Sequence, residues 1–150
     1  MTANSGTCTS TATWAADNNF NGATRSRTTV AEPGDPPAKT VHVGNLTGIS
    51  SSGGSYWVAG VSTLVEDANH NPVGGAKVTA TWSSGTKSSG SCTTTKGGYC
   101  TITSGRISNT SANVIFTVTK ITKSGYTYDP MANHDSAGDS NGTTMEVKKP

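Results

Sequence analysis

Charged residues are scarce in this chain of 150 residues. They make up 13% of it, and 11 Lys and Arg residues against 9 Asp and Glu residues leave a net charge of +2. Because the basic residues are scattered singly, they offer no positive stripe to a phosphate backbone, and nucleic acid is not an expected partner. Low hydrophobicity without a high net charge also argues against a disordered chain.

Long apolar runs are missing as well. No run approaches the roughly 18 residues of a membrane helix, so no membrane span is expected. The start, Met1 to Asn4, lacks the basic and apolar regions of a signal peptide. We therefore expect Met1 to be an added start on a fragment of a longer secreted protein. The alternative, a cytosolic protein with free thiols, fits the composition rich in Ser, Thr and Gly less well.

Cysteine is rare too, and two of the three cysteines flank a glycine turn. Cys92 and Cys100 lie about equally far from Lys96-Gly97-Gly98, so a hairpin folded at this turn brings them opposite each other on adjacent strands. We predict a disulfide between them, which indicates an oxidising, extracellular compartment. Cys8 is left over, and an odd cysteine in an exported chain suggests a partner outside the chain or an intermolecular bond.

What the sequence does contain is the alternation of apolar and polar residues that is typical of strands. In the expected strand Tyr56–Glu66, Trp57 and every second residue after it form the core face. In Ala76–Trp82, Trp82 and the alternate residues before it form the core face. Both tryptophans are therefore expected in the core rather than on a sugar-binding surface. No segment shows helical periodicity, and about seven short strands predict an all-β, Ig-like β-sandwich.

Two further strands carry expectations about their ends and faces. Val41–Val43 is expected to open a strand, and Gly44 and the Ser51–Ser55 run are expected to supply turns. Asn113–Lys123 is expected to be the longest strand and central in its sheet, because both of its faces are partly apolar, with Phe116 on one and Ile121 on the other.

The chain is expected to have three parts. Residues 1–31 read as a β-hairpin arm or the remnant of a preceding domain, 32–39 as a linker rich in proline, and 40–150 as the sandwich. In the hairpin, the turn Asp17–Gly22 precedes the threonine-rich run Thr24–Ala31, and over about twenty residues this is similar to the last two strands of a polycystic-kidney-disease-type or related Ig-like domain.

Residues 40–150 also carry a recognisable combination of motifs: the turn Asp67-Ala68-Asn69-His70-Asn71-Pro72-Val73, the cysteine pair, Tyr128-Asp129-Pro130 and Asp139-Ser140-Asn141-Gly142-Thr143. Together they resemble a bacterial Ig-like module, of the invasin or fibronectin kind, that is appended to secreted subtilisin-like peptidases and other exoenzymes. The resemblance implies an accessory role and leaves the ligand open.

Calcium is the cofactor considered for the loop from residue 129 to residue 142. Asp129, Asp135, Asp139 and Asn141 place several oxygen ligands there, and an alternate-ligand pattern followed by glycine is typical of a calcium turn. The alternative is that these side chains only cap turns through hydrogen bonds to the backbone.

Polysaccharide or a cell-surface glycan is the ligand considered for the tyrosines. Tyr126 and Tyr128 share one strand face, and together with Tyr56 they could form an aromatic strip that stacks on sugar rings. Tyrosines at sandwich corners more often only bind the backbone.

The three histidines, His42, His70 and His134, lie in separate segments without the spacing of a zinc or catalytic motif. His70 and His134 lie in polar turns and are expected to be solvated or bonded within those turns, and no catalytic residue is predicted. We expect a non-catalytic extracellular accessory module of a larger secreted bacterial protein, a spacer, stabiliser or weak polysaccharide binder, whose partners include the other domains of that protein. The alternative is a subunit of a surface fibre or adhesin that assembles by strand pairing.

Overall fold

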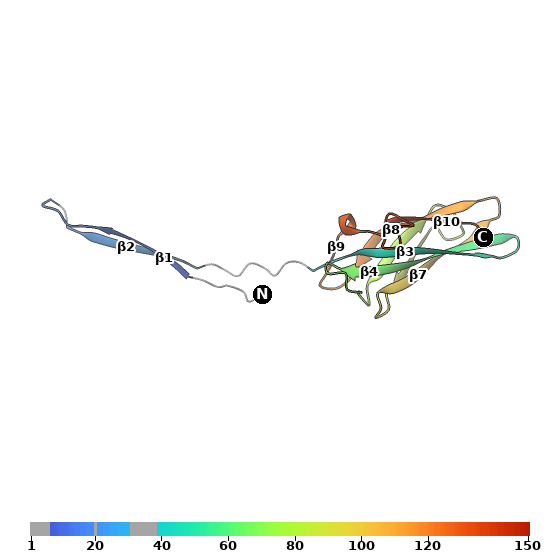
Figure 1. The fold of residues 1–150 in the computed structure, drawn as a ribbon, viewed down its shortest axis with the longest axis horizontal. Helices are drawn as coiled ribbons and strands as arrows, with labels where there is room; N and C mark the ends of the chain where they lie inside the picture. The colour runs from blue at the N-terminus through green and yellow to red at the C-terminus, as the bar shows by residue number, and fades with distance from the viewer. Residues whose placement is uncertain (1–6, 20, 31–38) are drawn as a thin grey trace. The chain divides into compact units, whose positions relative to one another are not determined.

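A computed structural model describes residues 7–19, 21–30 and 39–150 (Figure 1). The chain divides into two compact units, residues 1–37 and residues 38–150, and each is described by itself. The described residues form strands and one short 3₁₀ helix, which confirms the all-β prediction. No helix among them is long and apolar enough to cross a membrane.

The first unit contains a β-hairpin, as predicted. β1 (Thr7–Trp14) pairs antiparallel with β2 (Ala23–Val30), in a register that runs from Thr7 opposite Val30 to Trp14 opposite Ala23. Every residue of both strands is exposed to solvent. The exposed free Cys8 lies on β1. Of the predicted linker, residues 32–38 lie outside the described residues.

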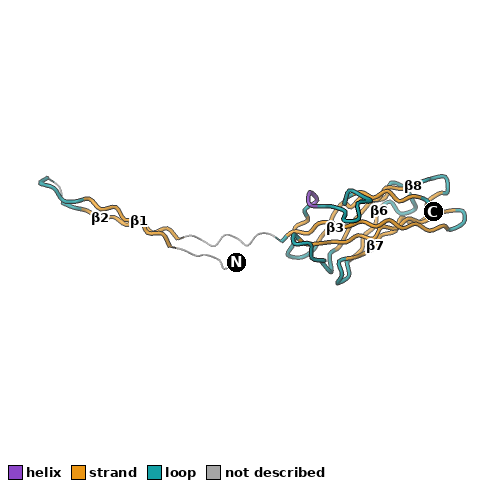
Figure 2. The backbone as a smooth tube through the Cα atoms, in the orientation of Figure 1, coloured by secondary structure: helices purple, strands orange, loops and turns teal. Residues whose placement is uncertain are grey.

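The second unit is a sandwich of two four-stranded sheets (Figures 1 and 2). In one sheet the order is β7-β4-β3-β9, and in the other it is β10-β8-β5-β6. A short helix, η1 (Pro130–Ala132), follows β9 and is the purple turn in Figure 2. The strands are β3 (Thr40–Ser52), β4 (Tyr56–Asp67), β5 (Lys77–Trp82), β6 (Ser89–Thr93), β7 (Tyr99–Ser108), β8 (Asn113–Thr122), β9 (Thr127–Tyr128) and β10 (Thr144–Lys148).

The core lies between the two sheets and follows the predicted alternation. Trp57 and Trp82 are both buried, as expected, and the Trp82 ring packs against Phe116 with 4.9 Å between ring centroids. The Trp57 indole N–H donates to the carbonyls of Ser108 and Ser111, so its burial leaves no polar atom unpaired.

β8 is central in its sheet, as predicted, but the expected face of Ile121 is wrong. Ile121 is buried together with Val118. The pairing of β5 with β8 skips one residue of β8, so that Thr79 faces Lys120 and Ala80 faces Val118. This β-bulge changes the alternation and turns Ile121 into the core.

The expected turn at Gly44 is also wrong. β3 continues to Ser52 and, at 13 residues, is longer than β8. Gly44 lies at a β-bulge, because the pairing with β4 skips one residue between Val43 and Asn45. The glycine therefore marks a local irregularity within a strand rather than a turn.

The disulfide between Cys92 and Cys100 is confirmed, with 5.8 Å between the two Cα atoms. The predicted hairpin around it is wrong, since β6 pairs with β5 and β7 pairs with β4. The turn at Lys96-Gly97-Gly98 carries the chain from one sheet to the other, and the disulfide joins the edge strands of the two sheets. A structural disulfide fits an oxidising environment.

Candidate metal centre

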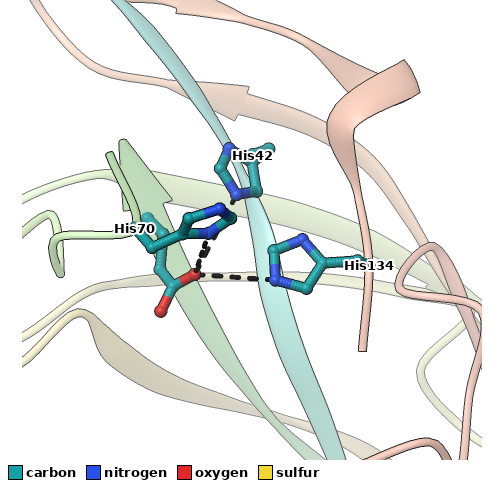
Figure 3. Close-up of side chains that lie close together, drawn as sticks. His42, His70 and His134 are labelled. Atoms are coloured by element: carbon teal, nitrogen blue, oxygen red, sulfur yellow. Dashed lines mark hydrogen bonds and ion pairs between the residues drawn. The ribbon is translucent and has the colours of Figure 1, made fainter. Parts of the chain in front are cut away.

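Four side chains from separate parts of the sequence meet at the end of the sandwich where β3 begins (Figure 3). We call this group the metal centre; it consists of His42, Glu66, His70 and His134. One potential ligand atom of each residue lies within 4.8 Å of those of the others. The Glu66 Oε2 atom is the common neighbour, at 3.3 Å from His70 Nδ1, 3.8 Å from His134 Nε2 and 3.9 Å from His42 Nε2.

The sheet positions the first two members. His42 on β3 and Glu66 on β4 are direct partners in the antiparallel register. Val41 and Val43 face the core, so His42 between them points to the opposite face of the sheet. The bulge residue Gly44 makes room for the carboxylate, because a Cβ at this position would collide with Glu66.

A rigid turn positions His70, four residues after Glu66. The Asp67 carboxylate accepts hydrogen bonds from the backbone N–H groups of Asn69 and Asn71, and these bonds lower the pKa of Asp67. His70 has a φ of 60° and is the one non-glycine residue with a positive φ in the described part of the chain. Such a conformation costs on the order of 1 kcal/mol or more and occurs often in ligand clamps.

The loop after η1 brings in His134. Its backbone N–H donates to the Val43 carbonyl at 3.0 Å, and the neighbouring Asn133 side chain accepts a hydrogen bond from the Val43 N–H at 2.8 Å. The loop then folds back so closely that a Cβ at Gly142, where φ is 76°, would collide with the His134 backbone. His134 is therefore held along the edge of β3.

The tautomer of His134 follows from its second nitrogen. Nδ1 lies 3.2 Å from the Ala132 carbonyl, which can only accept, so Nδ1 carries the proton. In the neutral ring this leaves the lone pair on Nε2, 3.8 Å from Glu66 Oε2, where a metal ion would bind it. A backbone carbonyl that orients the distal nitrogen in this way is typical of histidines that bind metals.

His42 is the most unusual member of the group. It is 3% exposed, and neither of its ring nitrogens makes a hydrogen bond to any described residue. Burial, followed by the nearby His134 and His70 rings, lowers the pKa of His42 and so favours the neutral ring. A buried imidazole without partners loses its bonds to water, a cost that a bound cation would offset.

The donor set suits a transition metal better than calcium. Neutral imidazoles and one carboxylate are ligands for zinc and its neighbours, whereas calcium takes six to eight oxygens. A tetrahedral zinc with bonds of about 2.0–2.1 Å has ligand atoms about 3.4 Å apart. The distances from Glu66 are 3.3–3.9 Å and all four ligand atoms lie within 4.8 Å of one another, so the side chains must draw together to coordinate an ion.

None of the residues predicted for calcium belongs to the metal centre, and one oxygen each of Asp129, Asp135 and Asn141 caps a turn. Asp129 accepts from the Met131 N–H, Asp135 from the Ala137 and Gly138 N–H groups, and Asn141 from the Thr143 and Thr144 N–H groups. Asp135 and Asp139 are neighbours. Burial and the Asp135 carboxyl raise the pKa of Asp139. Burial also acts to raise the pKa of Asp135, but hydrogen bonds from Ser140, Ala137 and Asp139 outweigh it, and the pKa of Asp135 is lowered.

The three predicted tyrosines do not lie together. Tyr128 pairs with Val41 at the start of β3, and Tyr126 is two residues away. Tyr56 begins β4 at the other end of β3, next to the turn, and its ring lies under the Arg106 guanidinium. The Tyr128 hydroxyl accepts a hydrogen bond from Asn133, and burial raises the pKa of Tyr128. Sugar binding by these residues stays a prediction.

The sequence analysis placed the three histidines in separate turns and strands and did not predict that they meet. The missing information was tertiary: the β3–β4 register, and the loop that runs along β3. One local signal existed, since Glu66 and His70 are four residues apart on the two sides of a tight turn.

Comparison with protein families, with curated proteins and with solved structures finds no match for the chain. The function of the site is therefore inferred from its geometry.

Proposed function

We propose that residues 38–150 form a non-catalytic extracellular module that binds one divalent transition-metal ion, of the zinc class, at the metal centre. The observation that carries this proposal is the convergence of four ligand atoms, within 4.8 Å of one another, from β3, β4, the following turn and the loop after η1. The burial of His42, whose ring nitrogens make no hydrogen bond to a described residue, also supports it.

A structural role for the ion follows from the number of ligands. Structural zinc sites are closed by four protein ligands, whereas catalytic sites use three and keep one position for water. The metal centre offers four, so a bound ion acts as a cross-link between segments. The disulfide supports an extracellular setting, and an Ig-like accessory or spacer role in a longer secreted protein is part of the same proposal.

Isothermal titration of the full chain with Zn²⁺ tests this function. We expect one site per chain, and a loss of affinity of at least about tenfold for each ligand variant. His70→Asn is the sharpest variant, because asparagine tolerates a positive φ and so keeps the turn. Glu66→Gln removes the charge at constant shape. Lys96→Ala, an exposed position on the 94–98 turn, is the matched control. Equal affinity of wild type and His70→Asn would contradict the proposal.

Calcium binding in the 129–142 loop is a separate proposal, which the melting temperatures of the wild type and the His70→Asn variant test. If Asp135, Asp139 and Asn141 bind calcium, Ca²⁺ should raise the melting temperature of the His70→Asn variant as much as that of the wild type. Zn²⁺ should raise only that of the wild type. An absence of any Ca²⁺ effect removes the calcium proposal and leaves the zinc proposal in place.

A second candidate function is assembly into a surface fibre by strand pairing. The observation that favours it is the β1–β2 hairpin, which is exposed on both faces and has two unpaired edges among the described residues. Light scattering over a range of concentrations, with and without residues 1–37, decides it. A chain that stays monomeric at high concentration contradicts assembly through the hairpin.

A further inference from the structure

The metal centre lies where the chain enters the sandwich. β3 begins at Thr40, two residues before His42. The chain leaves at the other end of the same strand. The Lys149 N–H donates to the Ala112 carbonyl. Ala112 follows Ser111, and the carbonyls of Ser108 and Ser111 accept from the Trp57 indole. Trp57 in turn pairs with the last residue of β3. Figure 1 shows β3 along the length of the sandwich, with the C-terminus at the end away from β9.

This arrangement decides how force acts on the sandwich. A pull on both ends of residues 39–149 acts along β3 and shears it against β4, because the antiparallel hydrogen bonds between them are perpendicular to the strands. The first residues to be loaded are those at the start of β3, from Thr40 to Val43.

The backbone bonds at this loaded end are confined to a short stretch of β3. On one side, three residue pairs at Val41–Val43 join β3 to β4 before the ladder is interrupted at the Gly44 bulge. On the other side, β9 pairs with the first two residues of β3, and backbone N–H groups of residues 127–136 donate to the carbonyls of Lys39, Val41, Val43 and Gly44. The loaded end is therefore the place where an additional cross-link has the greatest effect on shearing.

We propose that the bound ion is a mechanical clamp, an inference that rests on the proposed metal binding. Coordination of His42 ties the loaded end of β3 to β4, to the 67–71 turn and to the loop after η1 at one point, on the entry side of the bulge. These ties run across the direction of shear, so β3 cannot slide past β4 until a metal–ligand bond breaks. A spacer in a longer extracellular protein carries load through this entry.

Force spectroscopy on the full chain, with handles at both ends, tests the clamp. Zn²⁺ alone is the probe, compared with a chelator in the same buffer. Unfolding of residues 39–150 is recognised by a gain of about 3.5 Å for each released residue, with the Cys92–Cys100 loop kept closed. At constant force we expect Zn²⁺ to slow this step by about tenfold or more.

Two variants locate the effect. His134→Asn removes the tie to the loop, and His70→Asn removes the tie to the turn; both should lose most of the effect of Zn²⁺ on the unfolding rate under force. Lys96→Ala should retain it. The comparison of wild type with and without chelator does not depend on whether any variant folds.

The outcomes separate the two proposals. If calorimetry detects Zn²⁺ binding but the lifetime under force is unchanged, the clamp is overturned and the metal-binding module stands. The same holds if Zn²⁺ slows unfolding in urea but not under force. If Zn²⁺ does not bind, the proposed function fails, and the clamp fails with it.

Discussion

At the residue scale, His42 couples the stability of the sandwich to pH. Burial and the two neighbouring histidines lower the pKa of His42 below the ordinary value of 6.5. Above pH 6.5 the ring is neutral in both the folded and the unfolded chain, and there is no penalty. Below it the unfolded chain takes up a proton that the folded chain resists, so the free energy of unfolding falls until the folded pKa is reached.

Urea unfolding in the presence of a chelator, at about pH 7.5 and about pH 5.5, measures this fall. The wild type should be less stable at the lower pH, and His42→Leu should lose less stability between the two. An equal loss in both proteins would mean that His42 titrates normally.

Gly44 is the second residue with a defined task. A Cβ there would collide with the Glu66 carboxylate, so Gly44→Ala should displace the carboxylate and weaken Zn²⁺ binding by about tenfold or more. Gly97→Ala is the matched control, because its nearest neighbour would be 3.8 Å away. Calorimetric titration of both variants checks the prediction; equal affinities would contradict it.

At the element scale, the disulfide stabilises the junction of the two sheets. It closes a loop between residues 92 and 100, and the chain-entropy estimate for so short a loop is about 2–3 kcal/mol. Reduction should therefore lower the melting temperature by several degrees without unfolding the sandwich at room temperature. Calorimetry with and without reductant measures this, and unfolding at room temperature would show that the core depends on the disulfide.

The β1–β2 hairpin should contribute no stability to the sandwich. Both of its strands are exposed throughout, and an isolated two-stranded hairpin is marginally stable in water. Deletion of residues 1–37 is expected to leave the melting temperature of the remaining unit unchanged within about 1 °C. A marked decrease would reveal that the two units depend on each other.

The elements differ in how far the sequence predicts them. The period-two alternation around Trp57 and Trp82 located the core strands, because burial on one face leaves a local pattern. The extension of β3 past Gly44 and the assignment of β6 and β7 to different sheets were not predictable in this way. Bulges and sheet crossovers depend on partner strands that are distant in the sequence.

At the scale of the whole molecule, the metal centre depends on three long-range relations: the β3–β4 register, the Asp67 turn and the loop along β3. Its histidines have no motif spacing, so composition and local pattern could not identify them. The calcium ligands and the tyrosines were chosen from local patterns alone. In the folded chain Asp129, Asp135 and Asn141 cap turns, and the tyrosines lie at opposite ends of β3.

A crystal structure of the full chain grown with Zn²⁺, with anomalous differences measured at the zinc edge, is the most direct measurement of the central claim. The predicted result is one strong peak about 2.0–2.2 Å from His42 Nε2, Glu66 Oε2, His70 Nδ1 and His134 Nε2. A peak only at the carboxylates of the 129–142 loop, or no ordered peak at the start of β3, would contradict it.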